Sequence, residues 1–196
     1  MKKIFLVCIF AGIAGFQAYA QKSLTWDIQL MLGREREPLP KSQSITIEDE
    51  QNLNVIVSPA SDCFCYIISQ NSERKLFILY DQPVKGNMKI RVNPLQADNS
   101  PGVKTMYVIV SLEKQTKLED AIKNFKSDSG SQRNANNVQG EIAKLQDTAS
   151  GLGEPVSALI TSGGTTRGAA QELTTRFSEK SLYVRTITIR TAAPAP

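Results

Sequence analysis

The chain has 196 residues, and its 23 basic and 19 acidic side chains leave a small formal net charge of +4. No run of Lys or Arg forms a basic patch, so we expect neither nucleic acid nor an anionic lipid surface as a partner. Histidine is absent from the whole sequence. Because His is the most common general base and metal ligand, its absence argues against a hydrolase or metalloenzyme. We therefore expect no catalytic residue, metal site or cofactor.

The first twenty residues have the organisation of a secretory signal peptide. Lys2 and Lys3 precede an apolar run at residues 4–16, and Ala18-Tyr19-Ala20 has the small-x-small pattern of a cleavage site. The apolar run is too short for a permanent transmembrane helix, and no later stretch is long enough for one. We expect residues 1–20 to be removed and the mature chain to act in the periplasm, cell envelope or outside of a bacterial cell.

Alternating or continuous apolar segments predict a series of short strands in the first half of the chain. Pro, Gly, Asn and Asp separate these segments, which is typical of a β-sandwich-like, antiparallel fold. An α+β fold is the second choice. The charged segment 33–42, which contains Pro38 and Pro40, predicts a loop. The expected strands lie at residues 24–32, 44–47, 53–57, 63–68, 75–80, 88–92 and 106–112.

One of these strands, at residues 63–68 (CFCYII), is apolar on both faces. Such a strand belongs in the interior of a sheet that is covered on both sides. The next apolar segment, KLFILY at 75–80, follows a short polar turn and is the expected hairpin partner.

The second half has a different pattern. Thr116 followed by Glu119 resembles a helix N-cap, and Leu118, Ile122 and Phe125 have helical spacing. We expect a helical insertion at about 116–150, with a flexible connector at 127–137 and a second helix from 138 to 149. Residues 151–168 predict a loop, and 182–190 predict a strand that returns to the sheet begun near residue 24. This would give a single β-rich domain at 21–191 and a disordered tail at 192–196.

Several of these segments together resemble domain-of-unknown-function family 4384, which occurs in bacterial exported and multidomain proteins. The resemblance rests on the strands at 53–58, 62–68 and 76–80, on Pro101-Gly102, and on the segment 107–111; it covers about residues 43–112 well. The closing segment 183–189 is similar to the end of exported spirochaete members. The chain departs from the family at Asp81-Gln82, which precede Pro83 where the family has Pro directly after the aromatic residue. It also departs at Lys104-Thr105, which stand where the family usually has a Glu after Pro-Gly. The resemblance implies an accessory, recognition or assembly role, with no catalytic residues to carry over.

Cys63 and Cys65 are the most distinctive side chains for chemistry. On an extended strand they project from the same face, with Cα atoms roughly 6.5–7 Å apart, near the upper limit for a disulfide. A strained disulfide at this position would be a candidate redox pair. Two thiolates without further Cys or His make an incomplete zinc site. The simpler interpretation is that both are small apolar residues packed in a core strand.

A second candidate is the segment 162–168 (SGGTTRG), in which Gly163, Gly164 and Arg167 could hold an anion. It lacks the Lys of a nucleotide-binding P-loop and follows only a short apolar segment, which favours an ordinary flexible loop.

From the sequence we therefore expect an exported, non-enzymatic binding or scaffolding module whose partner is a protein or an envelope component. Addition of a peptide to a sheet edge is one binding mode that suits this architecture. The alternative is a thiol-based redox or metal-handling protein that uses Cys63 and Cys65.

Overall fold

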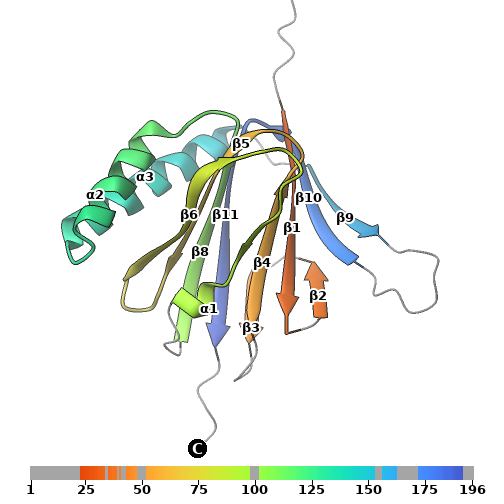
Figure 1. The fold of residues 1–196 in the computed structure, drawn as a ribbon, viewed down its shortest axis with the longest axis horizontal. Coiled ribbons are helices and arrows are strands. Elements are labelled where there is room, and N and C mark those ends of the chain that lie inside the picture. The colour runs from red at the N-terminus through yellow and green to blue at the C-terminus, as the bar shows by residue number, and fades with distance from the viewer. Residues whose placement is uncertain are drawn as a thin grey trace, which may run out of the picture.

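The computed structural model describes residues 23–33, 35–38, 40, 43–47, 52–97, 102–152, 156–162 and 172–191. The proposed signal peptide and the C-terminal tail at 192–196 lie outside the described residues. Two β-sheets face each other, and a helical layer covers the outer side of one of them (Figure 1). The prediction of a mostly β, sandwich-like fold with helices in the second half is confirmed.

Sheet A has the strand order β7-β4-β1-β10-β9. The short strand β2 pairs with the C-terminal part of β1, residues 29–32. Sheet B has the order β3-β11-β8-β5-β6. The strands of sheet A are β1 (Leu24–Leu32), β2 (Glu35–Pro38), β4 (Leu53–Pro59), β7 (Ile90–Val92), β9 (Val156–Ser162) and β10 (Glu172–Lys180). Those of sheet B are β3 (Ser44–Ile47), β5 (Cys63–Gln70), β6 (Leu76–Val84), β8 (Gly102–Ser111) and β11 (Leu182–Thr191).

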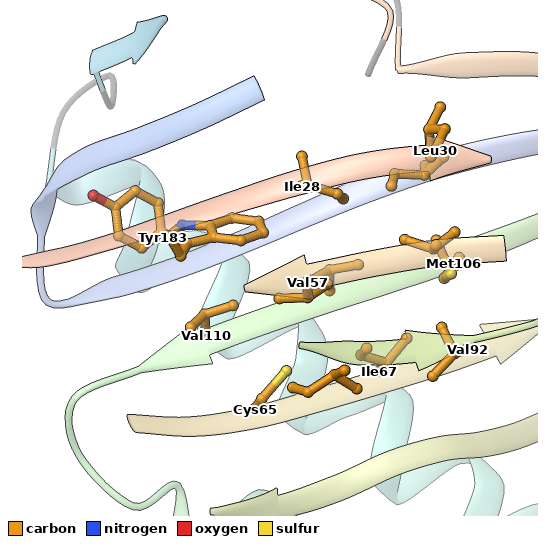
Figure 2. Close-up of a cluster of buried hydrophobic side chains, with 14 of the residues drawn as sticks. Ile28, Leu30, Val57, Cys65, Ile67, Val92, Met106, Val110 and Tyr183 are labelled. Atoms are coloured by element: carbon orange, nitrogen blue, oxygen red, sulfur yellow. The ribbon is translucent and has the colours of Figure 1, made fainter. Parts of the chain in front are cut away.

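The main hydrophobic core lies between the two sheets. Alternate residues of each strand point into it, as the period of two along a strand requires. Trp26 of β1 is fully buried there and stacks on Phe177 of β10, with ring centroids 4.8 Å apart. Figure 2 shows side chains of sheet A (Ile28, Leu30, Val57, Val92) lying among side chains of sheet B (Cys65, Ile67, Met106, Val110, Tyr183).

A second core joins sheet B to the helical layer, which consists mainly of α2 (Thr116–Ser127) and α3 (Gln132–Gly151). A short helix, α1 (Pro94–Ala97), lies between β7 and β8. Tyr66 and Ile68 of β5 and Ile109 of β8 face the helices; the helical residues that cover them include Leu118, Ile122, Phe125, Val138 and Ile142. Strand β5 is therefore an interior strand buried on both faces, and it pairs with β6 as the sequence predicted.

Three segments expected to be irregular contain regular structure. Within 33–42, Glu35–Pro38 pair with β1, and within 151–168, Val156–Ser162 pair with β10. The expected connector at 127–137 is much shorter, because α3 already begins at Gln132. The hydroxyl of Ser131 accepts the backbone N–H of Asn134 (3.4 Å) and caps this helix. The polar first turns of α3 are held by tertiary packing, since Ala135 is buried against the second core.

The prediction for the last strand was wrong about its sheet. β11 pairs with β8 and, in parallel, with β3, both in sheet B; β10 is the strand that pairs with β1. The parallel pair also makes sheet B mixed rather than wholly antiparallel. An alternating pattern predicts a strand and its buried face, but it does not specify the neighbouring strand.

The chain crosses from sheet A to sheet B between β10 and β11 through one residue, Ser181. The hydroxyl of Tyr183 fixes this crossover. It accepts the backbone N–H of Lys180 (2.9 Å) and donates to the carbonyl oxygen of Leu24 at the start of β1 (3.1 Å). One buried side chain of β11 is therefore hydrogen-bonded to β10 and β1 of the opposite sheet.

Candidate functional site

Cys63 and Cys65 lie on β5 with their side chains in the core between the sheets. Their thiols are not bridged, and only 4% of Cys63 and 0% of Cys65 is exposed. Burial raises the pKa of Cys63 to about 11, and the pKa of Cys65 lies higher still for the same reason. Since the thiolate is the reactive and metal-binding form, this position suits packing better than thiol chemistry.

No group of three or more His, Cys, Asp or Glu side chains that could hold a metal ion occurs within the described part of the chain. The other sequence candidate, the loop with Gly163, Gly164 and Arg167, lies outside the described residues. Among the described residues, the structure therefore places no further metal ligand beside Cys63 and Cys65. It does not test the proposed anion loop.

The structure points instead to β6, the edge strand of sheet B next to the helical layer (Figure 1). β6 has nine residues, compared with four in β3 at the other edge of the same sheet. Its one strand partner among the described elements is β5. An edge strand presents a row of backbone N–H and C=O groups that another extended segment can pair with.

The C-terminal half of β6 carries features that discourage such pairing. The carboxylate of Asp81 forms an ion pair with Lys126 of α2 at 2.7 Å. Pro83 is exposed and has no backbone N–H to donate. Charges and proline on an edge are common protections against unwanted strand association.

The N-terminal half of β6 contains neither a charged residue nor a proline. Leu76–Tyr80 (LFILY) are five consecutive apolar residues, and all of them except Leu76 are half-buried. Phe77 lies on the face of sheet B that is turned toward the main core. It pairs with Ser69, Ser69 pairs with Met106 of the main core, and paired residues of neighbouring strands lie on the same face. Lys75 lies over the Phe77 ring, with its ammonium nitrogen 5.5 Å from the centroid.

A β-bulge occurs inside this apolar run. Ile67 pairs with Tyr80 and Ile68 pairs with Ile78, so Leu79 is the extra residue. Leu79 and Tyr80 both pack against the main core, whereas Ile78 packs against the helical side. A bulge bends an edge and changes the direction of neighbouring side chains.

The strand behind this edge is held firmly against the helical layer. The hydroxyl of Tyr66 on β5 donates to the Glu119 carboxylate (2.9 Å) and accepts the backbone N–H of Gln115 (3.1 Å) at the start of α2. The same carboxylate pairs with Lys114 at 2.8 Å. Burial raises the pKa of Tyr66, so its hydroxyl stays protonated and keeps its role as donor. The N-cap position is Gln115, not Thr116 as the sequence suggested.

Sequence reasoning found β6 as a strand but did not identify it as an edge. The signal that was present is the combination of an uninterrupted apolar segment with Asp81 and Pro83 directly after it, which suits an edge rather than an interior strand.

Comparison of the chain with protein-family models, with curated proteins and with solved structures gave no match. The resemblance to family 4384 therefore stays a prediction. None of the helices within the described ranges has the length and apolar character needed to cross a bilayer.

Proposed function

We propose that the protein is an exported, non-enzymatic module that binds or scaffolds a protein or envelope component, with β6 as its binding edge. The observation that carries this proposal is the apolar half of β6, Leu76–Tyr80, which has no charged residue and no proline and lies on a strand whose partner β5 is buried on both faces. A rigid sheet edge of this kind supplies backbone hydrogen bonds to a partner strand, and the neighbouring side chains supply selectivity.

Export is the second part of the proposal, and it rests on the residues 1–20. Expression of the full chain with its own leader, followed by cell fractionation and N-terminal sequencing, tests it. We expect the mature protein to begin at Gln21 and to be recovered outside the cytoplasm. Recovery in the cytoplasm with residues 1–20 attached would contradict this part.

Site-specific photo-crosslinking in the source cell tests the binding edge. A benzophenone amino acid replaces Phe77 at the edge or, as a control, Ala143 on the exposed side of α3. We expect a protein adduct from position 77 that is absent or much weaker from position 143. Equal adducts from both positions, or none from position 77, would contradict a role for β6.

The thiol-based alternative rests on the placement of Cys63 and Cys65 on one face of β5. Burial of both side chains and the raised pKa of each thiol weigh against it. Reversible bridging of the two cysteines in the folded protein, detected by mass spectrometry under oxidising and reducing conditions, would favour this alternative over the binding module.

A further inference from the structure

The turn before the apolar run of β6 carries a net charge of +1 from Glu73, Arg74 and Lys75. Arg74 and Lys75 are both exposed, and neither forms an ion pair with another described residue. Lys75 is oriented along the strand by its contact with the Phe77 ring. By contrast, the charge at the other end of the run, Asp81, is already paired with Lys126. A partner strand at this edge would therefore meet a turn of net charge +1 at one end and the neutralised Asp81–Lys126 pair at the other.

A second copy of this chain, paired through β6 about Ile78, does not bring opposite charges together. Two copies of β6 paired antiparallel about Ile78 would bring Lys75 of one copy opposite Asp81 of the other. The bulge at Leu79 prevents a match, because Lys75 lies on the core-facing side with Phe77 whereas Asp81 lies on the helical side with Lys126. Opposed residues of an antiparallel pair must lie on the same face to interact.

We propose that the Leu76–Tyr80 edge binds an extended peptide antiparallel to β6, with apolar side chains at alternate positions and a carboxylate at its C-terminal end. The carboxylate meets Lys75 and Arg74, because the C-terminal end of an antiparallel strand lies beside the start of β6. The alternate apolar side chains lie beside Phe77 and Tyr80 on the core-facing side. This inference rests on the proposed function and adds the chemical class of the ligand.

A random octapeptide display library, selected against the mature protein, tests the inference. We expect selected peptides with apolar residues at every second position and Asp, Glu or the free carboxyl terminus at the C-terminal end. A selected peptide should slow amide hydrogen exchange within residues 76–80 and leave the other edge strand of the sheet, β3, unchanged. Selection of basic peptides, of no common pattern, or of peptides that protect a different segment would overturn the inference.

A charge reversal provides the matched comparison. Lys75→Glu should weaken binding of a selected peptide by about fivefold to tenfold, the range for one surface charge contact turned repulsive. Lys144→Glu makes the same change on α3, where Lys144 pairs with Glu141, and should leave binding unchanged. Equal affinity of the wild-type protein and the Lys75→Glu variant would refute the proposed role of the basic end.

The experiments also distinguish a peptide at the β6 edge from a second copy of this chain, and peptide binding in vitro from the proposed cellular function. If the peptide-free protein forms a concentration-dependent dimer in sedimentation, with residues 76–80 already protected from exchange, then a second copy fills the edge and the inference is wrong. If library peptides bind as described but crosslinking in cells gives no adduct, the inference holds and the proposed cellular function fails.

Discussion

Replacement of Tyr183 by Phe removes one hydroxyl and keeps the ring that packs beside Trp26. The hydroxyl accepts the N–H of Lys180 and donates to the carbonyl oxygen of Leu24, and both bonds are buried. Loss of one buried hydrogen bond costs about 1 kcal/mol, and a backbone group left without a partner costs more. We therefore expect Tyr183→Phe to lower the free energy of unfolding by about 2 kcal/mol.

Urea unfolding followed by tryptophan fluorescence measures this change, since the one Trp of the chain, Trp26, lies in the same core. The midpoint should fall while the slope with denaturant stays constant, because the buried surface is unchanged. The corresponding decrease in melting temperature is roughly 4–8 °C for a domain of this size. Tyr107→Phe is the control, because the Tyr107 hydroxyl has no hydrogen bond to the described residues and should cost under about 0.5 kcal/mol. Equal effects of the two substitutions would refute the assigned role of the Tyr183 hydroxyl.

Gly86→Ala should destabilise the fold by about 1–3 kcal/mol in urea unfolding, because the added Cβ would lie 2.9 Å from the backbone of Ala60 and Ser61. Gly140→Ala, on the open surface of α3, should instead stabilise it by about 0.5–1 kcal/mol, and a stabilised Gly86→Ala variant would contradict the packing described for this turn. Both Cys63 and Cys65 should react with a thiol reagent at pH 8 far more slowly in the native protein than in urea, as followed by peptide mass spectrometry; equal rates would mean that the thiols are accessible. The pKa of Asp62 is lowered by its hydrogen bonds to Lys85 and to the N–H of Gly86, so its stabilising effect is present above about pH 3.8 and is lost as the pH falls through the lower folded-state value. Asp62→Asn should therefore lose less stability than the wild type between neutral pH and pH 3 in acid titrations, and identical titration curves would argue against this linkage.

The sequence predicted eight of the strands, β1, β3–β8 and β11, and the interior position of β5, because their signals are local. The segment 63–68 has no polar face, and the structure places it between β8 and β6 with a core on each side. The helical spacing of Leu118, Ile122 and Phe125 likewise predicted a helix with one buried face, and all three are buried.

What the sequence could not predict depends on partners distant in the chain. β2 and β9 are strands because they pair with β1 and β10, and no local sequence pattern predicts these pairings. The polar residues at the start of α3 are helical because Ser131 caps the helix and Ala135 is buried. The same holds for the candidate site. KLFILY alone is equally compatible with an interior strand, and its place at an edge is known only from the strand order of sheet B.

The crossover at Ser181 has a consequence for how the molecule is made. β10 lies between β1 and β9, and β11 lies between β3 and β8, so the last twenty described residues supply an internal strand to both sheets. A nascent chain that ends before Glu172 lacks both, so β1, which can already pair with β2 and β4, still lacks its third partner, β10, about 150 residues away. Neither sheet can therefore reach its final strand order before β10 and β11 are present.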